Sequence, residues 1–402
     1  MPSESANSAN VVVIGGGVIG SSIAMHLAQM GAGKVILLEK EHLASGATGR
    51  SGAMIREHYL HPTLVKMAQE SSQVFHNFDE IIGGDVRFIQ TGRIILLPDG
   101  DVAAGRANVA MNRELGVNIQ TLTPAEIVRL VPQMSTDGVA LGLYEPNSGY
   151  ADSVATTHAF ARQAEARGAT ILTGCRATGF KVVGGRLAGV ETESGIIETD
   201  AAVVAAGPWT NWLAAPLGEF LPITPLRVQM VHLRRPPALE SFTPTVIDQT
   251  NGAYFRLNAG FYTLMGGEAP EDMGEVVNPD AYGLNAEHDT IIRYWQRARL
   301  RFPDFAATTP QGGYGSLYDM TPDGNPILDR AQSVDGLFWA AGFSGHGFKL
   351  SPVIGRMMAD LVIHGDSMGH ELKGFRAARF SDSLARGDSL APEHPYQARS
   401  HP

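Results

Sequence analysis

The sequence predicts a mixed α/β protein of two domains, in which a Rossmann-type dinucleotide-binding domain is interleaved with a domain built on an antiparallel sheet. Three observations predict this class. An apolar strand, a glycine-rich turn and a helix follow one another near the start of the chain. Two later stretches, 200–207 and 337–347, also pass from an apolar strand into glycine. The length of 402 residues exceeds that of a usual single domain.

Composition and charge narrow the kinds of molecule that the protein is expected to bind. The net charge is −10, from 31 basic and 41 acidic residues, and no run rich in lysine or arginine points to nucleic acid. No apolar run approaches the roughly 18 residues that cross a bilayer, and the polar segment 1–10 is unlike a secretion signal or a transit peptide. The single cysteine, Cys175, excludes an internal disulfide and a multi-thiolate metal site, and a small buried thiol explains it. We therefore expect a cytoplasmic protein with no metal, no membrane span and no nucleic-acid partner.

The first strand, turn and helix carry the glycine pattern of a dinucleotide site. The strand covers 11–14, and glycines follow at Gly15, Gly17 and Gly20 before an apolar helix. Gly15 permits the tight turn, Gly17 lets the backbone approach a pyrophosphate, and Gly20 lets the helix pack closely on the strand. The free N–H groups at the start of the helix then face the phosphates.

A second apolar strand over 34–39 ends on an acid, Glu39. A carboxylate at this place can accept hydrogen bonds from the ribose of an adenosine. The alternative is a glycine turn in another kind of α/β protein, with Glu39 at a solvated strand end. The flanking strand, turn and helix favour the dinucleotide site.

The stretch over 45–52 is rich in glycine and small hydroxyl residues. Such residues are poor material for a core, and they suit a loop that lies flat against a ligand and donates backbone and hydroxyl hydrogen bonds. An NAD-dependent dehydrogenase would usually continue from its second strand into a plain helix. The stretch therefore disfavours that alternative.

Helical spacing and capping signals predict the helices of the middle of the chain. They cover 63–82, 101–116, a segment from Pro124, 154–167 and 286–301. Thr123 is the expected N-cap of the helix that begins at Pro124.

β-branched and alternating segments predict the strands. A strand pair joined near Gly92 is expected within 86–97, and a loop over 142–152 returns to the first domain. Short strands over 170–199 are expected to form a small separate sheet, and strands between 222 and 267 an antiparallel sheet that covers one face of the ligand.

Four segments resemble those of FAD-dependent amine oxidoreductases of the D-amino-acid oxidase superfamily, such as glycine oxidase and sarcosine oxidase. They are 45–52, Ala206-Gly207-Pro-Trp209-Thr210, Met320-Thr-Pro-Asp-Gly-Asn-Pro326-Ile and Ala341-Gly-Phe-Ser-Gly-His-Gly-Phe-Lys349. The resemblance covers essentially the whole chain. It implies a discontinuous FAD-binding domain over 1–84, 145–215 and 313–402, and a substrate-binding domain over 85–144 and 216–312.

The resemblance also implies which residues hold FAD. They are Gly15, Gly17, Val18, Ile19, Gly20, Glu39, Lys40, Ser45, Ala47, Thr48, Gly49, Arg50, Ser51, Ala177, Ala206, Gly207, Trp209, Gly342, Gly345, His346, Gly347, Phe348 and Lys349. Monomeric sarcosine oxidase bonds its FAD to a cysteine where this chain has Ser316, and relatives that use a histidine would need it near Arg50. FAD is therefore expected to be non-covalent.

Two cations are implied to clamp the carboxylate of the substrate, namely Arg56 and Lys349. Arg56 offers a bidentate fork and Lys349 a point charge. The alternatives are that Arg56 pairs with Glu57 or lies exposed, and that Lys349 caps a turn. Tyr254 is expected over the substrate or as an ordinary strand aromatic, and His58 is expected to polarise the substrate or to pack.

The implied reaction is oxidation of the C–N bond of a glycine- or sarcosine-like α-amino acid. A hydride passes to flavin N5, the resulting imine hydrolyses, and O2 is reduced to H2O2. The chain departs from sarcosine oxidase in having no lysine between Lys181 and Lys349, where the family member has one that activates oxygen. Three alternatives stay open: a dehydrogenase with another acceptor, oxidation of a 2-hydroxy acid with His58 or His232 as base, and a non-catalytic flavoprotein subunit. The sequence leaves the oligomeric state open.

Overall fold

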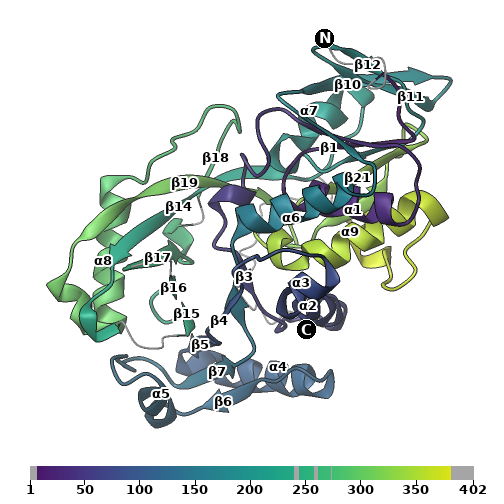
Figure 1. The fold of residues 1–402 in the computed structure, drawn as a ribbon. Helices are drawn as coiled ribbons and strands as arrows, with labels where there is room; N and C mark the ends of the chain where they lie inside the picture. Colours follow the sequence, from purple (N-terminus) through teal and green to yellow (C-terminus); the bar gives the residue numbers. More distant parts are fainter. Residues whose placement is uncertain (1–6, 240–243, 258–260, 273, 382–402) are drawn as a thin grey trace.

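Two large sheets organise the chain, one parallel and one antiparallel (Figure 1). The structure, a computed structural model, describes residues 7–239, 244–257, 261–272 and 274–381. It confirms the predicted class, since the parallel sheet carries helices on one face and the antiparallel sheet lies beside it. Within the described residues, no helix is long and apolar enough to cross a membrane.

The parallel sheet has the strand order β20-β21-β13-β1-β2-β9, with β20 antiparallel to β21. Its strands are β1 (Val11–Ile14), β2 (Val35–Glu39), β9 (Thr170–Thr173), β13 (Ala202–Val204), β20 (Ile327–Arg330) and β21 (Leu337–Ala341). Every residue of β1 is buried, because Val11 and Val13 face one layer while Val12 and Ile14 face the other. Continuous apolar strands of this kind are typical of a sheet covered on both faces.

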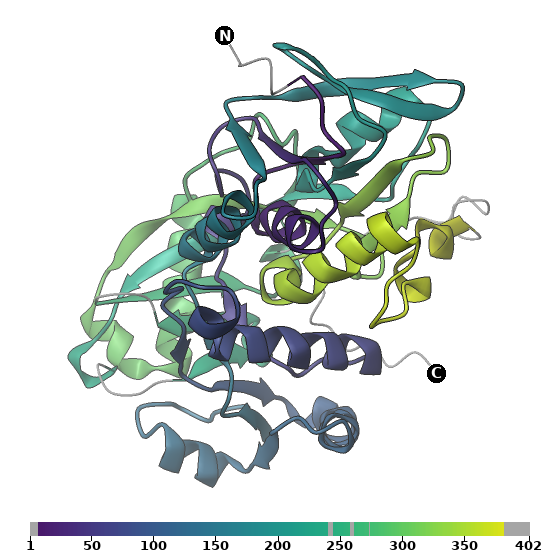
Figure 2. The ribbon, with the colours of Figure 1, turned by 45° about the vertical axis from the view of Figure 1, so that its right-hand side comes forward.

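Helices cover one face of this sheet and a small sheet covers the other. Helices α1 (Val18–Gln29), α6 (Ser153–Glu165) and α9 (Gly347–His364) lie together on the first face (Figure 2). Strands β10 (Ala177–Val183), β11 (Arg186–Thr192) and β12 (Gly195–Ile197) lie on the second. Helices α1 and α9 approach closely, since the Ser22 hydroxyl donates to the Ser351 carbonyl over 2.7 Å.

The antiparallel sheet has nine strands, in the order β18-β14-β17-β16-β15-β5-β7-β6 with β19 paired to β14, and within it β5 and β15 run parallel to each other. They are β5 (Arg93–Leu97), β6 (Gln120–Leu122), β7 (Leu141–Glu145), β14 (Thr224–Arg234), β15 (Thr245–Asp248), β16 (Ala253–Leu257), β17 (Tyr262–Gly267), β18 (Glu275–Val276) and β19 (Pro310–Met320). Helices α5 (Pro124–Leu130) and α8 (His288–Arg301) pack on its outer face. Its inner face is turned toward the parallel-sheet part of the molecule.

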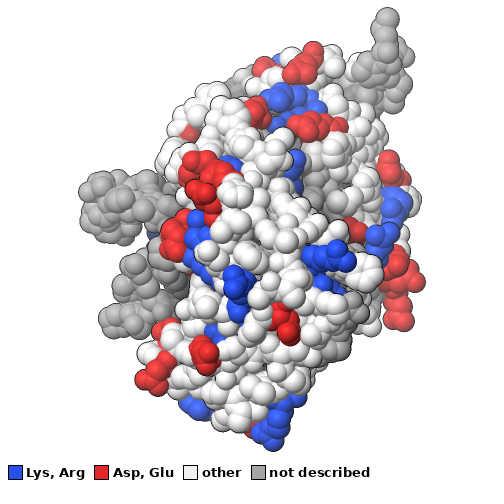
Figure 3. All heavy atoms as spheres, turned by 90° about the vertical axis from the view of Figure 1, so that its left-hand side faces the viewer, with Lys and Arg blue, Asp and Glu red and all other residues white. Residues whose placement is uncertain are grey.

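The remaining elements connect these layers. They are β3 (Met54–Ile55), β4 (Ile89–Gln90), β8 (Gly149–Tyr150), α2 (Pro62–His76), α3 (Phe78–Ile81), α4 (Val102–Glu114) and α7 (Thr210–Ala214). On the face that Figure 3 shows, acidic and basic side chains are interspersed over the antiparallel-sheet part, so neither sign dominates the field there.

Several local predictions are wrong, and each has a physical reason. The strands near Gly92 do not pair with each other, because the positive φ of 71° at Gly92 turns the chain so that β4 joins β8 while β5 enters the large sheet. The predicted loop over 142–152 holds β7 and β8, since β7 is mostly apolar and pairs with β5. Strand β9 belongs to the parallel sheet and not to the small one, because it pairs with β2.

Other local predictions agree with the structure. Thr123 caps α5, and together with Glu126 it forms a capping box. The helix predicted over 63–82 is present but is divided at Asn77 into α2 and α3. The sheets use segments from both halves of the chain, while the division into two domains with the boundaries given above stays a prediction.

Candidate active site

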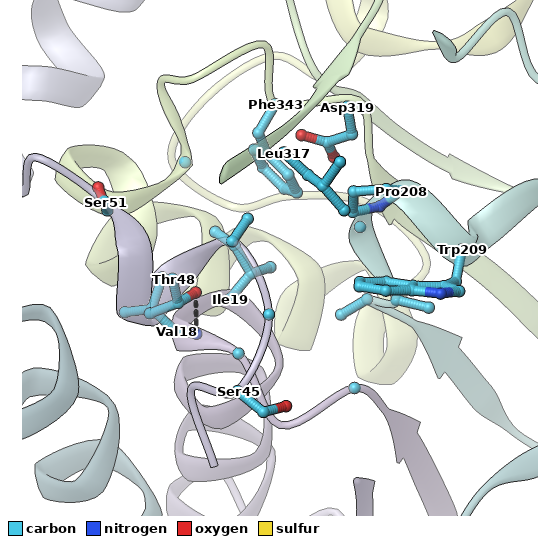
Figure 4. A pocket seen from close by; sticks show the side chains of 18 of the residues that line it. Val18, Ile19, Ser45, Thr48, Ser51, Pro208, Trp209, Leu317, Asp319 and Phe343 are labelled. Carbon is cyan, nitrogen blue, oxygen red and sulfur yellow. Dashed lines mark hydrogen bonds between the residues drawn. The ribbon is translucent and has the colours of Figure 1, made fainter. Parts of the chain in front are cut away.

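A cavity of about 440 Å³ lies where the carboxyl ends of β1, β2 and β13 meet the inner face of the antiparallel sheet (Figure 4). Residues of the first turn and of the segment 45–54 form one side, and residues of β14, β16 and β19 form another. The start of α9 closes one end. In open α/β sheets, ligands bind at the carboxyl ends of the strands, so the cavity has the position expected of a cofactor site.

The glycine turn after β1 is shaped by close backbone contacts. Gly15 has a φ of 114°, and a side chain there would overlap the Ala205 carbonyl. A side chain at Gly20 would overlap the Gly15 carbonyl. The Val18 N–H donates to the Thr48 hydroxyl over 3.2 Å, which ties the start of α1 to the segment 45–54. The glycines therefore allow the turn and the start of α1 to pack closely beside Gly17, which lines the cavity where a pyrophosphate would bind.

Glu39 ends β2 and lies on the cavity wall, fixed by three donors. Its carboxylate accepts from the Gly16 N–H at 2.7 Å, the Glu41 N–H at 2.9 Å and the Ser45 hydroxyl at 3.2 Å. An ionised carboxylate has about four acceptor positions, so one is left for a ligand hydroxyl. This geometry suits the predicted role of Glu39 toward a ribose.

Lys40 and Trp209 lie together beside Glu39. The Lys40 ammonium is 3.8 Å from the centre of the Trp209 ring. Both bond to Asp280, with 2.9 Å from Lys40 Nζ and 2.6 Å from Trp209 Nε1. Arg176 also pairs with Asp280 at 3.4 Å. Asp280 lies between β18 and α8, so a segment of the antiparallel-sheet part closes over this end of the cavity.

The other end is formed by the turn before α9. Lys349 lies in the first turn of α9, is only 4% exposed and lines the cavity, and its Nζ donates to the Gly345 carbonyl over 3.4 Å. Burial lowers the pKa of Lys349 well below its usual value, and the nearby Arg56 and Arg93 lower it further. A cation held in this way is stabilised by a bound anion.

Arg56 and His58 are buried behind the cavity and do not line it. Arg56 donates to the His58 carbonyl and stacks 3.8 Å over the Tyr59 ring. His58 hydrogen-bonds Asn108, and burial together with Arg93 and Arg56 lowers its pKa to about 3. His58 is therefore neutral at ordinary pH.

Arg93 is a member of this cluster that the sequence analysis missed. It begins β5, is buried, and shares the inner face with Ile95 and Leu97. Together with Arg56 it acts on Lys349 and also on Glu268, a buried carboxyl whose pKa burial raises to about 8 against the effect of the two arginines. An arginine at the head of an otherwise apolar strand was the available signal. That signal could not show which face of the sheet the arginine occupies, because this depends on the register of the sheet.

Tyr254 lies on β16 and lines the cavity. Its hydroxyl donates to the Met230 sulfur over 2.9 Å, and Gly266 leaves the space that its ring fills. The side chain is thus both a packed strand aromatic and part of the wall.

The predicted cofactor residues line the cavity except Gly20, Gly49, Gly342 and His346. These glycines shape backbone next to the wall, since a side chain at Gly49 would overlap the Ala44 carbonyl and one at Gly342 the Thr321 side chain. His346 instead contacts the Tyr59 hydroxyl at 3.1 Å. Cavity residues that the sequence analysis did not name include Arg176 and Asp319.

The fold and this cavity define an FAD-dependent oxidoreductase. The family model described as FAD dependent oxidoreductase matches residues 10–361. The chain belongs to this family, and its cofactor is FAD. The glycine turn, the fixed Glu39 carboxylate and the start of α9 fit that group, because they offer close backbone approach, a ribose acceptor and free N–H groups.

Relatives within the family differ in their named substrates. Human mitochondrial sarcosine dehydrogenase is 30% identical over 408 residues, which is 98% of this chain and 43% of that protein. The structure of L-proline dehydrogenase from P. horikoshii has a TM-score of 0.86 at 29% identity and covers 95% of this chain and 99% of that one. Glycine oxidase from Geobacillus kaustophilus has a TM-score of 0.80 at 25% identity and covers 93% and 99%. The chain spans less than half the length of the curated sarcosine dehydrogenases that it matches.

Proposed function

We propose that the protein oxidises the C–N bond of a glycine- or sarcosine-like α-amino acid, with a primary or N-substituted amine, and that O2 accepts the electrons. The observation that carries this proposal is a cluster of basic side chains in which Lys349 lines one end of the FAD cavity and Arg56 and Arg93 lie close to Lys349 behind that wall. Three cations in a buried place are suited to binding a carboxylate. The names of the relatives, which act on sarcosine, proline and glycine, agree with such a substrate.

The side chains orient the substrate and do not supply a strong base. FAD, when bound, supplies the acceptor for a hydride from the substrate carbon. Lys349 binds the carboxylate directly, and Arg56 and Arg93 strengthen the positive potential behind it. Tyr254 and Met230 form an apolar wall that keeps water from the reacting carbon.

A 2-hydroxy acid as substrate would need a histidine that could take its hydroxyl proton. His58 and His232 are the candidates, and neither lines the cavity among the described residues. Burial lowers the pKa of both, in each case with help from a neighbouring arginine. An amine substrate that enters as the free base needs no such group, so the amine is favoured.

The electron acceptor has a second candidate. Between Lys181 and Lys349 the chain has no lysine, so the residue that activates oxygen in sarcosine oxidase has no counterpart. A dehydrogenase with an acceptor other than O2 is therefore the alternative. Non-covalent FAD is part of either proposal, since Ser316 stands where a cysteine would bond the cofactor and Cys175 lies near Glu39 at the other end.

The experiment is an anaerobic titration of the FAD-loaded protein, followed through the visible flavin band. The panel is glycine, sarcosine, N-alkyl glycines, proline, D-amino acids and 2-hydroxy acids. Bleaching by one amino acid, reversed at once by air, is the expected result. Bleaching that air reverses only slowly would indicate the dehydrogenase, and a protein that no panel member bleaches would contradict the proposal.

A further inference from the structure

A buried carboxylate, Asp319, lies on the wall of the FAD cavity and has no role in the function proposed above. It belongs to β19, in the antiparallel sheet. Figure 4 shows its side chain beside Phe343, Leu317 and Pro208, at the same cavity. A charged carboxylate that is buried away from water needs hydrogen-bond donors. Those of Asp319 come from a different part of the chain.

Asp319 fastens the turn that precedes α9. Its Oδ2 accepts from the Gly342 N–H at 2.8 Å, and its backbone carbonyl accepts from the Ser344 N–H at 3.1 Å. The Ser344 hydroxyl in turn accepts from the Thr321 N–H at 3.0 Å. Ser344 has a φ of 51°, a conformation that costs energy for a residue with a side chain and needs such support.

The turn leads directly into the substrate and cofactor residues. Gly345 lines the cavity, its carbonyl accepts from Lys349 Nζ, and α9 begins two residues later. The free N–H groups at the start of α9 favour negative charge nearby. The carboxylate of Asp319 is a fixed negative charge at the same cavity, so it disfavours further negative charge nearby.

The charge state of Asp319 is set by burial and by the turn. Burial raises its pKa to about 6, although the backbone N–H groups of residues 319 and 342–344 favour the ionised form. Asp319 is therefore ionised at pH 8. In a low-dielectric surrounding such a charge acts over a longer range than in water.

We propose that Asp319 sets how readily the bound FAD is reduced, by fixing the turn before α9 and by placing a negative charge on the cavity wall. Reduction adds negative charge to the cofactor, which the free N–H groups at the start of α9 favour and the carboxylate opposes. Asp319 is thus a positioning residue, which acts through the turn and through its charge. The proposal rests on FAD binding and not on the identity of the substrate.

The test compares Asp319→Asn, Asp319→Ala and Asp319→Glu with the FAD-loaded wild type at pH 8. The readouts are the reduction potential of the bound FAD and its dissociation constant for sulfite, which adds to the flavin and brings negative charge. Asp319→Asn keeps an oxygen for the Gly342 N–H and removes the charge. It is expected to retain FAD, to shift the potential to a less negative value and to bind sulfite roughly tenfold more tightly, which is the effect of one unit charge removed from about 12 Å away at an effective dielectric constant of about 20.

The other variants separate charge from geometry. Asp319→Glu keeps the charge and is expected to bind sulfite as the wild type does, while Asp319→Ala releases the turn and is expected to lose FAD more readily. The matched control is Asp323→Asn, an aspartate that pairs with Arg379 at 2.8 Å and does not line the cavity. An unchanged potential and sulfite affinity in Asp319→Asn would overturn the proposal. So would loss of FAD from every neutral variant with unchanged behaviour in Asp319→Glu, since Asp319 would then act only in holding the cofactor.

Neither readout uses an amino acid. A failed proposal for the substrate, in which no amino acid bleaches the flavin, therefore leaves this test valid. A failed proposal for Asp319 likewise leaves the substrate titration unaffected.

Discussion

Lys349 is the side chain that the proposed function assigns to direct binding of the substrate carboxylate. It is buried, it lines the cavity, and its pKa is lowered by burial and by two arginines. A substrate carboxylate would relieve this unfavourable state, because it brings a negative charge to three buried cations.

Lys349→Met is expected to weaken the binding of a carboxylate ligand such as propionate by about 10- to 100-fold, the usual worth of a hydrogen bond to a charged group. FAD should stay bound, because the glycine turn after β1, the Glu39 carboxylate and the free N–H groups at the start of α9 remain. The dissociation constant of propionate, from perturbation of the flavin spectrum, is the measurement. Lys66→Met, an exposed residue of α2, is the control, and an unchanged constant in Lys349→Met would remove this lysine from the site.

The affinity for propionate is also expected to fall as the pH rises above about 8. Burial raises the pKa of Glu268 to about 8, so this carboxyl becomes negative beside Arg93 and Arg56 over that range. Lys349, whose pKa is lowered, loses positive charge in the same direction of pH. Both changes oppose an anion.

Propionate has no amine, so the pH profile of its dissociation constant reports the protein alone. In Glu268→Gln one of the two titrations is absent, and the loss of affinity above pH 8 should be smaller than in the wild type. Glu275→Gln, an exposed glutamate of β18, is the control. A profile that is flat from pH 7 to 9.5, or equal in Glu268→Gln and wild type, would contradict this electrostatic account.

At the scale of residues, the sequence allowed the cofactor site to be predicted much better than the substrate site. Glu39 and the glycines lie next to each other in short segments whose function depends on local geometry, and their places on the cavity follow from those segments. Arg93 and Asp319 could not be found in this way. Their roles depend on which face of the antiparallel sheet they occupy and on contacts with chain far away in sequence.

At the scale of elements, the structure depends on close approach of α1 and α9. Both helices begin at the FAD cavity, and their packing sets the directions of their N-termini. At Gly355 of α9 an added side chain would overlap Ser22 of α1. This glycine lies inside a helix, where alanine would usually stabilise by roughly 0.5–1 kcal/mol.

Gly355→Ala is therefore expected to reverse the usual sign and to lower the free energy of unfolding by about 1–3 kcal/mol, because overpacking outweighs helix propensity. Thermal unfolding of the FAD-loaded protein measures the effect. Gly100→Ala, where an added side chain meets no atom within 4 Å among the described residues, is the control. A higher midpoint in Gly355→Ala than in the wild type would show that the two helices can separate without cost.

Two of the wrong local predictions, those for β5 and β9, share one cause. Strands β5 and β9 were recognised as strands, but the partners assigned to them were wrong. Periodicity reports which residues are buried, whereas pairing is decided by strands that are distant in sequence. Helices with capping signals, such as α5, were predicted well because their signals are local.

At the scale of the whole molecule, the cofactor cavity is closed by contacts between the part of the chain that holds the parallel sheet and the part that holds the antiparallel sheet. Asp280, from the segment between β18 and α8, bonds to Lys40, Arg176 and Trp209 beside Glu39. Together these side chains form an ion-pair network over one end of the cavity. Such partly exposed networks weaken with salt.

Asp280→Asn is expected to speed the release of FAD several-fold, and the wild-type rate is expected to rise with salt toward that of the variant. The rise of flavin fluorescence after dilution measures the release. Asp289→Asn, an exposed aspartate in the first turn of α8, is the control. A release rate that neither the substitution nor salt changes would mean that this segment does not hold the cofactor in place.

The most direct measurement compares the amino acid that bleaches the flavin fastest with its own carboxamide, under anaerobic conditions in a stopped-flow instrument. The two compounds share the amine and the reacting carbon, and they differ only in the group that Lys349 is proposed to bind with the support of Arg56 and Arg93. The amino acid is predicted to reduce the flavin with at least about a 100-fold higher apparent second-order rate constant, as expected when a buried cationic site loses its anion. Equal rates for acid and amide would contradict the central claim that this cavity selects an α-amino acid by its carboxylate.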